Sequence, residues 1–529
     1  MKMFVDKIIA MWGRLNKMKI KKKKRRSMTD IGIMILLSIF ICKMSFFTST
    51  NEIFRVSNNQ IINKSSEINN IVVFIRFKGE DEFINSSRYS RIVDFYNGSG
   101  ISLKSYIDEI SYGKTNVNTL FYPFDGKGNC VSYVADNNRD YYKKATTSNL
   151  IGYKNEEERV QREQQLLNNS LTSIKGQLDT LKTSLDWNND NYIDNITFIL
   201  SGEKDLDEGT LRAHSGKLDR AGLIQNKRVG KYSLYIQGTD SVGIMGTDIR
   251  NLGLITKDFM KTLGYPELNT INNPKVTPVG KWDIMATTLT DPQLPLVYTR
   301  LTHGVDTGRS IKSITGSGTY TLNSSNSKNI DDTIAYKIIS PLNPSQYFVV
   351  EYRKNNDKWD SVLDIEKSGL LIYRVDESVN YEDGNSKGYP YNIYVFRKGT
   401  ISASSANGEI NEALISPLDG NTRYGSKVTE KFDSNSLFFQ GGTNSCIEIT
   451  NININTEGNI TFNVDIPNKI NNKSSDVNND GITDLMDLSN VAIKYNMRLV
   501  EENWNENYDI NSDGIIDIFD LVRIAKNIN

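Results

Sequence analysis

The chain has 529 residues, more than one ordinary hydrophobic core contains, so we expect two or more folded units. Its 63 Lys and Arg residues balance its 63 Asp and Glu residues, but residues 1–50 hold 12 of the basic and only 2 of the acidic ones. The other 51 basic and 61 acidic residues give a net charge of −10. That balance excludes the basic excess typical of nucleic-acid binding, so no nucleic-acid partner is expected.

The N-terminal segment has the pattern of an export signal. A basic block, Lys19 to Arg26, precedes an apolar run from Ile31 to Cys42. Twelve apolar residues form a helix of about 18 Å, too short for the ~30 Å hydrocarbon core of a bilayer. We therefore expect residues 1–50 to be a secretory signal peptide and expect no stable membrane span. An uncleaved anchor is the alternative, because no clear A-x-A site follows.

Residues 51–466 are predicted to form a mixed region. Asn70–Phe77 has the composition of a buried strand, and Asn155–Leu185 has the periodicity of a long amphipathic helix. After about residue 316, alternating segments such as YFVVEYR and GLLIYRV predict a β-rich part. Cys130 and Cys446 either pair or stay as free buried thiols, since two distant cysteines define no disulfide framework.

A loop inside this region has the spacing of a calcium-binding loop. Its oxygen donors are Asp186, Asn188, Asp190, the Tyr192 carbonyl and Asp194. Asn191 stands at the usual glycine position and adopts positive φ more readily than most residues. The twelfth position is Thr197, so a bidentate carboxylate is missing. A weak calcium site and a capped polar turn both remain open.

The C-terminal region contains an internal repeat. Two segments with the pattern D-x-N-x-D-G-x-x-D-x-x-D begin at Asp476 and Asp509, and an apolar-periodic helix follows each. Calcium takes six to eight oxygen ligands, and this spacing presents them around a turn made by Gly481 or Gly514. The sequence therefore predicts two calcium ions. The ligands are Asp476, Asn478, Asp480, Ile482, Asp484 and Asp487, and then Asp509, Asn511, Asp513, Ile515, Asp517 and Asp520.

This repeat closely resembles a type I dockerin over Ser474–Asn529, including Asp at the twelfth position. The resemblance implies a small all-α module of paired F-hand loops that binds a cohesin domain of a scaffold protein. In that family the tenth and eleventh loop positions often contact the cohesin, and here they are Leu485, Met486, Ile518 and Phe519. Packing at the start of their own helices is the alternative. Residues 467–473 are a polar linker.

The stretch LITKDFMKTLGYPEL, Leu254–Leu268, has the outline of a zinc-peptidase helix. Zincins carry H-E-x-x-H, in which two His side chains one turn apart bind zinc and the Glu is the general base. The segments around this stretch extend the likeness, in collinear order, over most of residues 70–465. They are IVVFIRFKGEDEF, LDWNNDNYIDNITFILSG, LRAHSGKL, VGKWDIMA, LPLVYTRLTHG, FVVEYRKNNDKWDSVLDIEKSGLLIYRVDES and GTNSCIEITNININTEGNITFNVDI.

Together these segments resemble the immune-inhibitor-A-type secreted metallopeptidases, the sixth metallopeptidase family. The resemblance implies an α+β fold with a zincin-like domain at 51–466, α/β to about residue 316 and β-rich after it. It also places Met285 under the metal site. The family's two His ligands map to Lys257 and Lys261, its Glu to Asp258 and its third ligand to Glu267.

Lysine is a cation with a pKa of about 10.4 and has no lone pair to offer a metal. Zinc is therefore not expected, and the site is interpreted as degenerate, with no catalytic residue. We interpret Lys257 and Lys261 as solvated helix residues; anion binding by these lysines with Asp258 is the alternative.

The function expected from the sequence is that of a secreted, cellulosome-type component. Its dockerin docks it to a scaffold, and its large domain is a pseudopeptidase that binds a peptide or glycan. Two alternatives stay open: an active extracellular hydrolase with an atypical metal site, and an adhesive or structural scaffold component.

Overall fold

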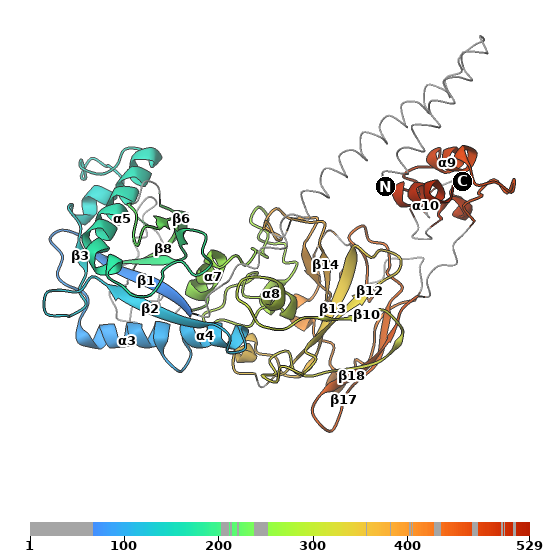
Figure 1. Cartoon of the computed structure of the whole chain (residues 1–529), viewed down its shortest axis with the longest axis horizontal. Helices are drawn as coiled ribbons and strands as arrows, with labels where there is room; N and C mark the ends of the chain where they lie inside the picture. Colours follow the sequence, from blue (N-terminus) through green and yellow to red (C-terminus); the bar gives the residue numbers. More distant parts are fainter. Residues whose placement is uncertain are drawn as a thin grey trace, which may run out of the picture. The chain divides into compact units, whose positions relative to one another are not determined.

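The computed structural model describes residues 67–202, 211, 214–218, 222–236, 252–467 and 474–528, with gaps at 356, 381, 401, 403, 405, 428–434, 499–500, 502 and 511–514. The expected signal peptide, most of the linker and the predicted ligands Asn511 and Asp513 lie outside these residues. The chain divides into two compact units, and the smaller contains Ser474–Ile510 and Ile516–Asn529. Helices and several sheets make it a mixed α and β protein (Figure 1).

The N-terminal part of the larger unit is built on one mixed sheet. Its strand order is β2 (Asn116–Tyr122), β1 (Glu67–Arg76), β5 (Ile196–Leu200), β8 (Lys231–Ile236) and β6 (His214–Lys217), with β3 (Tyr133–Val134) also paired to β1. The first four strands are parallel, and β6 runs antiparallel to β8. Eight consecutive residues of β1 are buried, as a parallel strand covered on both faces requires, which confirms the strand predicted near residues 70–77.

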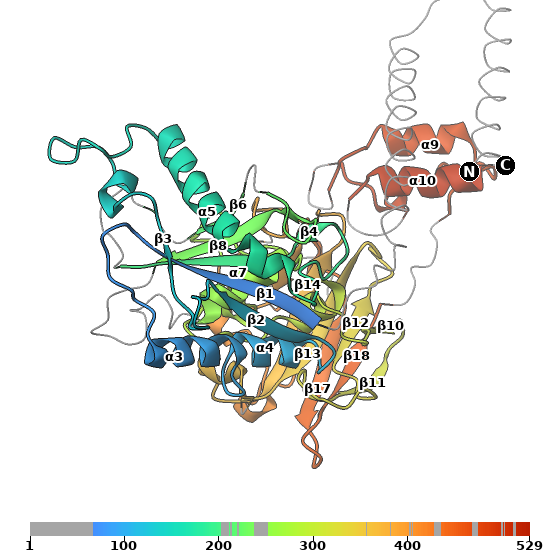
Figure 2. The ribbon, with the colours of Figure 1, turned by 60° about the vertical axis from the view of Figure 1, so that its left-hand side comes forward.

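Helices cover both faces of this sheet (Figure 2). They are α3 (Ser86–Asn97), α4 (Leu103–Ile110), α5 (Glu156–Asp179) and α7 (Leu252–Thr262). Alternate β1 side chains point to opposite faces. One set, which includes Val72 and Phe74, shares a core with α3, α4 and α7. The other set, which includes Ile71 and Val73, shares a core with α5.

Helix α5 begins where the sequence predicts and ends six residues early. The Asn155 side chain accepts a hydrogen bond from Glu158 N and so caps the first turn. At the other end, the Gln225 side chain donates to the carbonyls of Leu178, Leu181 and Thr183. These bonds satisfy carbonyl groups that a helix end leaves open, so the chain can turn after Asp179.

The C-terminal part of the larger unit consists of two sheets packed face to face, which confirms the β-rich part predicted after residue 316. One sheet has the order β10 (Lys312–Ile314), β12 (Ala335–Ile339), β13 (Gln346–Arg353), β14 (Gly369–Asp376) and β15 (Ile393–Val395). The other has the order β11 (Gly318–Leu322), β18 (Ile460–Asp465), β17 (Glu448–Ile454) and β16 (Tyr424–Gly425).

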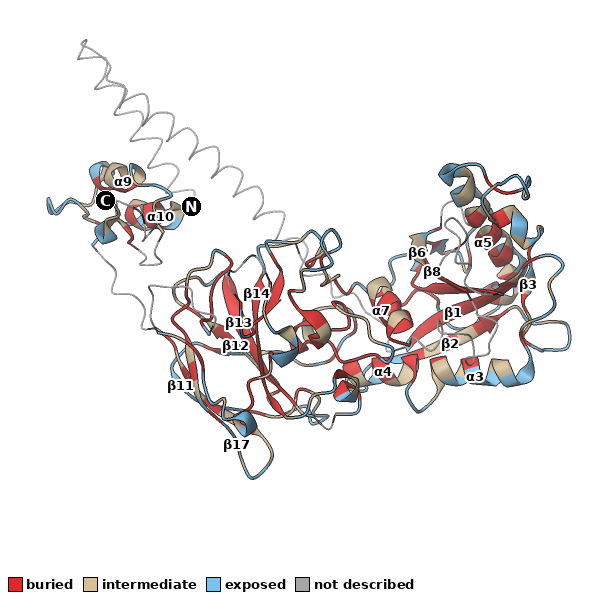
Figure 3. Cartoon of the chain, turned by 180° about the vertical axis from the view of Figure 1, so that it is seen from behind, coloured by how far each residue is buried: buried red, intermediate tan, exposed pale blue. Residues whose placement is uncertain are grey.

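Strands β13 and β14 are buried along their whole length (Figure 3). Phe348 and Val350 of β13 face the second sheet, whereas Tyr347 and Val349 belong to the core that also contains α4 and α7. The two parts of the larger unit therefore share one continuous core.

The smaller elements complete the description. In the larger unit they are the ladder of β4 (Tyr192–Ile193) with β7 (Arg228–Val229), and α8 (Val297–Thr302). In the smaller unit α9 (Leu485–Ala492) and α10 (Ile518–Asn527) pack around a small core with Val491, Ile516 and Ile524. Within the described ranges, no helix combines the length and apolar character that crossing a bilayer requires. Cys130 and Cys446 are both buried and free, and burial raises the pKa of Cys130 to about 12.

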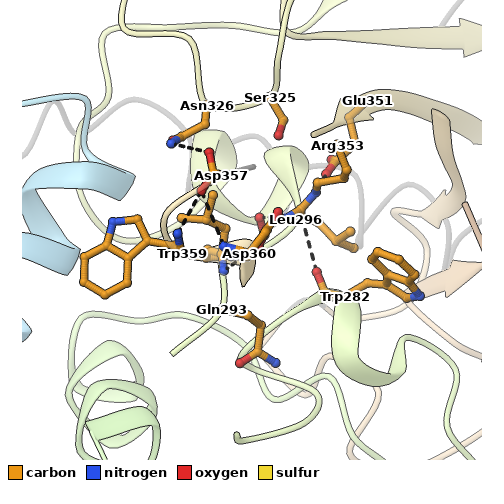
Figure 4. Close-up of polar contacts among 12 residues, drawn as sticks. Trp282, Gln293, Leu296, Ser325, Asn326, Glu351, Arg353, Asp357, Trp359 and Asp360 are labelled. Atoms are coloured by element: carbon orange, nitrogen blue, oxygen red, sulfur yellow. Dashed lines mark hydrogen bonds and ion pairs between the residues drawn. The ribbon is translucent and has the colours of Figure 1, made fainter. Parts of the chain in front are cut away.

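A buried ion network joins β13 to the segment before α8 (Figure 4). Arg353 Nε lies 2.6 Å from Glu351 Oε1 and Arg353 Nη1 lies 2.7 Å from Asp360 Oδ2, with all three side chains at most 1% exposed. Arg353 Nη2 also donates to the carbonyls of Trp282 and Pro295, at 3.3 and 3.0 Å. The remaining Glu351 oxygen accepts from Val297 N and Tyr373 OH. The network thus fixes residues 282–297 against the sheet.

We predict that Arg353→Met destabilises the larger unit by about 3–5 kcal/mol, because two carboxylates would stay buried without their partner. The free energy of unfolding in urea measures this loss. Lys367→Met is the control, since Lys367 forms an exposed pair with Asp419 and such pairs contribute little. Equal urea concentrations at the midpoint of unfolding for both variants would contradict the prediction.

Candidate functional site

Helix α7 carries Lys257 and Lys261, the two lysines singled out in the sequence. They lie four residues apart and therefore on one face of the helix. Lys257 is only 6% exposed, so the interpretation of this lysine as a solvated residue is wrong. The side chain of Lys261 is 38% exposed. Lys257 contacts Glu267, in the segment that follows the helix.

Both ammonium groups contact the same carboxylate. Lys257 Nζ lies 2.6 Å from Glu267 Oε1, and Lys261 Nζ lies 2.8 Å from Glu267 Oε2. The structure thus brings together Lys257, Lys261 and Glu267, the positions to which the three metal ligands of the resembled family map. The two lysines direct their ammonium groups at Glu267, so the structure offers no support for the anion-binding alternative.

Asp258 joins the same cluster from the neighbouring helix position. Its Oδ2 accepts a hydrogen bond of 2.8 Å from Tyr235 OH on β8, and its Oδ1 lies 3.7 Å from Lys261 Nζ. Burial, with the nearby Asp258 charge, raises the pKa of Tyr235 well above its ordinary value. Burial alone would lower the pKa of Lys261, but Glu267 and Asp258 raise it. Tyr235 and Lys261 are therefore held in their protonated forms at neutral pH.

The backbone around Glu267 is fixed by residues far away in sequence. Gly264 has φ +92° and turns the chain after α7. Asn385 N donates to Glu267 O at 2.8 Å, and Leu268 N donates to Met285 O at 3.1 Å. Met285 is fully buried in the core that contains α7. It therefore lies in the segment bonded to the residue that follows Glu267.

The cluster contains two cations and two carboxylates and no imidazole. Protonated lysine offers no lone pair to zinc. Of the two carboxylates, Glu267 faces both ammonium groups and Asp258 accepts a hydrogen bond from Tyr235. The geometry is that of a closed ion-pair cluster within the described residues, where no group of three or more His, Cys, Asp or Glu residues is placed to hold a metal.

The loop at 186–194 has a hydrogen-bond pattern that satisfies its first carboxylate. Asp186 Oδ1 accepts from Asp190 N and Asp186 Oδ2 from Asn191 N, both at 3.0 Å. Lys227 Nζ also lies 2.8 Å from Asp186 Oδ2. Asp194 accepts from Trp187 N, and burial together with the charges of Asp186 and Asp190 raises the pKa of Asp194 to about 7. Tyr192 is exposed and Asn188 donates to Asp190.

The first C-terminal loop has the same pattern of bonds. Asp476 accepts from Asp480 N at 3.1 Å and from Gly481 N at 2.8 Å, and Gly481 has φ +87°. Asp487 is fully buried and accepts from three backbone N–H groups, those of Val477, Asn478 and Asp484. Calcium takes oxygen ligands, and in this structure those of Asp476 and Asp487 accept from backbone N–H groups.

The second C-terminal loop is described in part. Asp509 and Asp520 are buried, and Asp517 accepts from Phe519 N at 2.8 Å while its own N–H donates to Asp520. Asp484 and Asp517 are thus the N-caps of α9 and α10, and Asp487 and Asp520 complete a capping box in each helix. The predicted ninth and twelfth ligands are therefore the residues that start the helices.

The four predicted cohesin-contact residues occupy the first two positions of these helices. Met486 is 58% exposed and Phe519 is 59% exposed, whereas Leu485 and Ile518 are half-buried. Exposure of Met486 and Phe519 argues against the alternative that they pack at the start of their own helices.

Sequence reasoning missed Tyr235 and Lys227 as members of these sites. Tyr235 is 23 residues from Asp258 and Lys227 is 41 residues from Asp186, so no local spacing links them. No family model and no curated protein matches the chain.

We predict that Lys257→Met destabilises the larger unit by less than the about 3–5 kcal/mol of a buried charge left unpaired, because Glu267 keeps Lys261 as a partly exposed partner. The double variant Lys257→Met, Glu267→Met should recover much of that loss. Urea denaturation of the natural sequence, the two single variants and the double variant measures the coupling free energy between Lys257 and Glu267. Additive losses would show that Lys257 and Glu267 do not act as a pair.

Proposed function

We propose that the chain is a secreted scaffold component with a calcium-dependent docking module at 474–529. Its larger unit is a zincin-like, metallopeptidase-like domain without zinc-dependent proteolysis. The placement of the lysine ammonium groups on Glu267 supports the second half of this proposal most directly. The paired loops and the exposed Met486 and Phe519 support the first half.

The helix caps suggest how docking depends on calcium. Each loop concentrates carboxylates that repel one another, and a bound calcium ion would offset that repulsion. Asp484 and Asp487 hold the first turn of α9, and Asp517 and Asp520 hold the first turn of α10. Met486 and Phe519 lie in these same turns. Ordering the carboxylates therefore orders the apolar side chains that face a cohesin.

The larger unit is proposed to act by binding a peptide or glycan. Zinc catalysis needs an open coordination position and a base that activates water. Here Lys257 and Lys261 contact Glu267, and Asp258 is bonded to Tyr235 and lies beside Lys261. None of these side chains is placed to hold a metal-bound water.

We predict that the full chain is captured by a type I cohesin from a panel of such domains in calcium and released by chelator. Asp476→Ala with Asp509→Ala should abolish capture, whereas either single change weakens it only in part, because one loop remains. Met486→Asp with Phe519→Asp should also abolish capture. Ile493→Asp is the matched control, because Ile493 is 77% exposed in the same module. Chelator-resistant capture, or no capture by any type I cohesin, would refute the docking proposal.

We predict that the purified chain retains no zinc after dialysis and shows no zinc-dependent cleavage of casein. Metal analysis and a protease assay with and without chelator measure this. The reversion variant Lys257→His, Asp258→Glu, Lys261→His, Glu267→Asp is expected to bind about one zinc ion. Robust cleavage by the natural sequence, lost in chelator and restored by zinc, would overturn the pseudopeptidase proposal.

A further inference from the structure

Two loops in different units of the chain have the same internal hydrogen bonds. In 186–194, Asp190 N donates to Asp186 Oδ1 and Asn188 Oδ1, and Tyr192 N donates to Asp190 Oδ1. In the loop that begins at Asp476, the residues 290 positions further along make the same three bonds. The left-handed residues also correspond, with Asn189 and Asn191 matching Asn479 and Gly481.

The two loops differ in the groups that contact their first carboxylates, those of Asp186 and Asp476. Lys227 Nζ is 2.8 Å from Asp186 Oδ2 and 3.2 Å from Asn191 Oδ1. The Asp186 side chain is fully buried and the Lys227 side chain is 26% exposed. In the described part of the smaller unit, no lysine or arginine forms an ion pair with Asp476.

The backbone fixes the position of Lys227. Ile224 and Lys227 bond reciprocally across a tight turn, and the two turn residues Gln225 and Asn226 both have positive φ. Arg228 N donates to Asn191 O at 2.9 Å, and β7 continues as a parallel partner of β4. The lysine is thus anchored on both sides, directly beside the loop that it contacts.

We infer that Lys227 is the resident cation of the 186–194 loop, and that its ammonium group replaces a calcium ion there. The chain itself thereby supplies a positive charge beside the first carboxylate of this loop. Of the two interpretations left open by the sequence, neither included this lysine. The missing carboxylate at Thr197 fits the inference, because a single ammonium charge needs fewer anionic partners than a divalent ion.

Substitution of Lys227 in the full chain tests the inference. Lys227→Met should destabilise the larger unit in chelator, and calcium should restore the stability of the unit. The dissociation constant for that calcium ion should be about 10⁻⁴–10⁻³ M, the range of weak sites. Calorimetry should show one more calcium ion per chain for the variant than for the natural sequence. This difference is independent of how many ions the C-terminal module binds, so it remains informative if the docking proposal fails.

Three further variants define the result. Lys227→Arg keeps the cation and should gain no calcium ion. Lys175→Met is the matched control. Lys175 donates to the Leu223 carbonyl, close to the turn that carries Lys227, but its ion-pair partner is Asp179, which lies outside the loop. Asp190→Asn added to Lys227→Met should remove the extra ion. The inference is overturned if the natural sequence already binds the extra ion, if folded Lys227→Met gains none, or if calcium leaves Lys227→Met unfolded.

Discussion

The side chain of Arg353 is fully buried, and its guanidinium group contacts the carboxylates of Glu351 and Asp360. Much of the larger unit depends on these two contacts. Burial of these charges is costly unless every donor and acceptor is used. Arg353 forms four hydrogen bonds, because it also donates to the carbonyls of Trp282 and Pro295. Residues 282–297 are thereby fixed, and Met285 within them bonds the residue that follows Glu267. The position of the lysine cluster on α7 thus traces back to an ion network on β13.

Much of this organisation could be predicted from the sequence, because local pattern determines it. The apolar run of β1, the start of α5 and the β-rich part after residue 316 are each encoded within a short window. The grouping of Lys257, Lys261 and Glu267 was expected only from the resemblance to the metallopeptidases, whose ligands map to these positions. The burial of Lys257 could not be predicted, because it depends on how the segment after α7 folds back.

The partners of the charged groups were also beyond local pattern. Tyr235 reaches Asp258 from β8, and Lys227 reaches Asp186 from a turn 41 residues away. The end of α5 also involves a distant residue, since the Gln225 amide that donates to the Leu178 carbonyl comes from that turn. Ion pairs between distant segments form only once the sheet brings those segments together.

The lysines on Glu267 have a consequence for how the larger unit responds to its surroundings. Two ammonium groups carry the same total charge as one divalent metal ion, but they are attached to the chain by covalent bonds. A metal-stabilised site loses stability by mass action as the free metal becomes scarce. Lys257 and Lys261 cannot dissociate from the chain in this way. Their contacts with Glu267 therefore form equally in a medium depleted of zinc and in one rich in it.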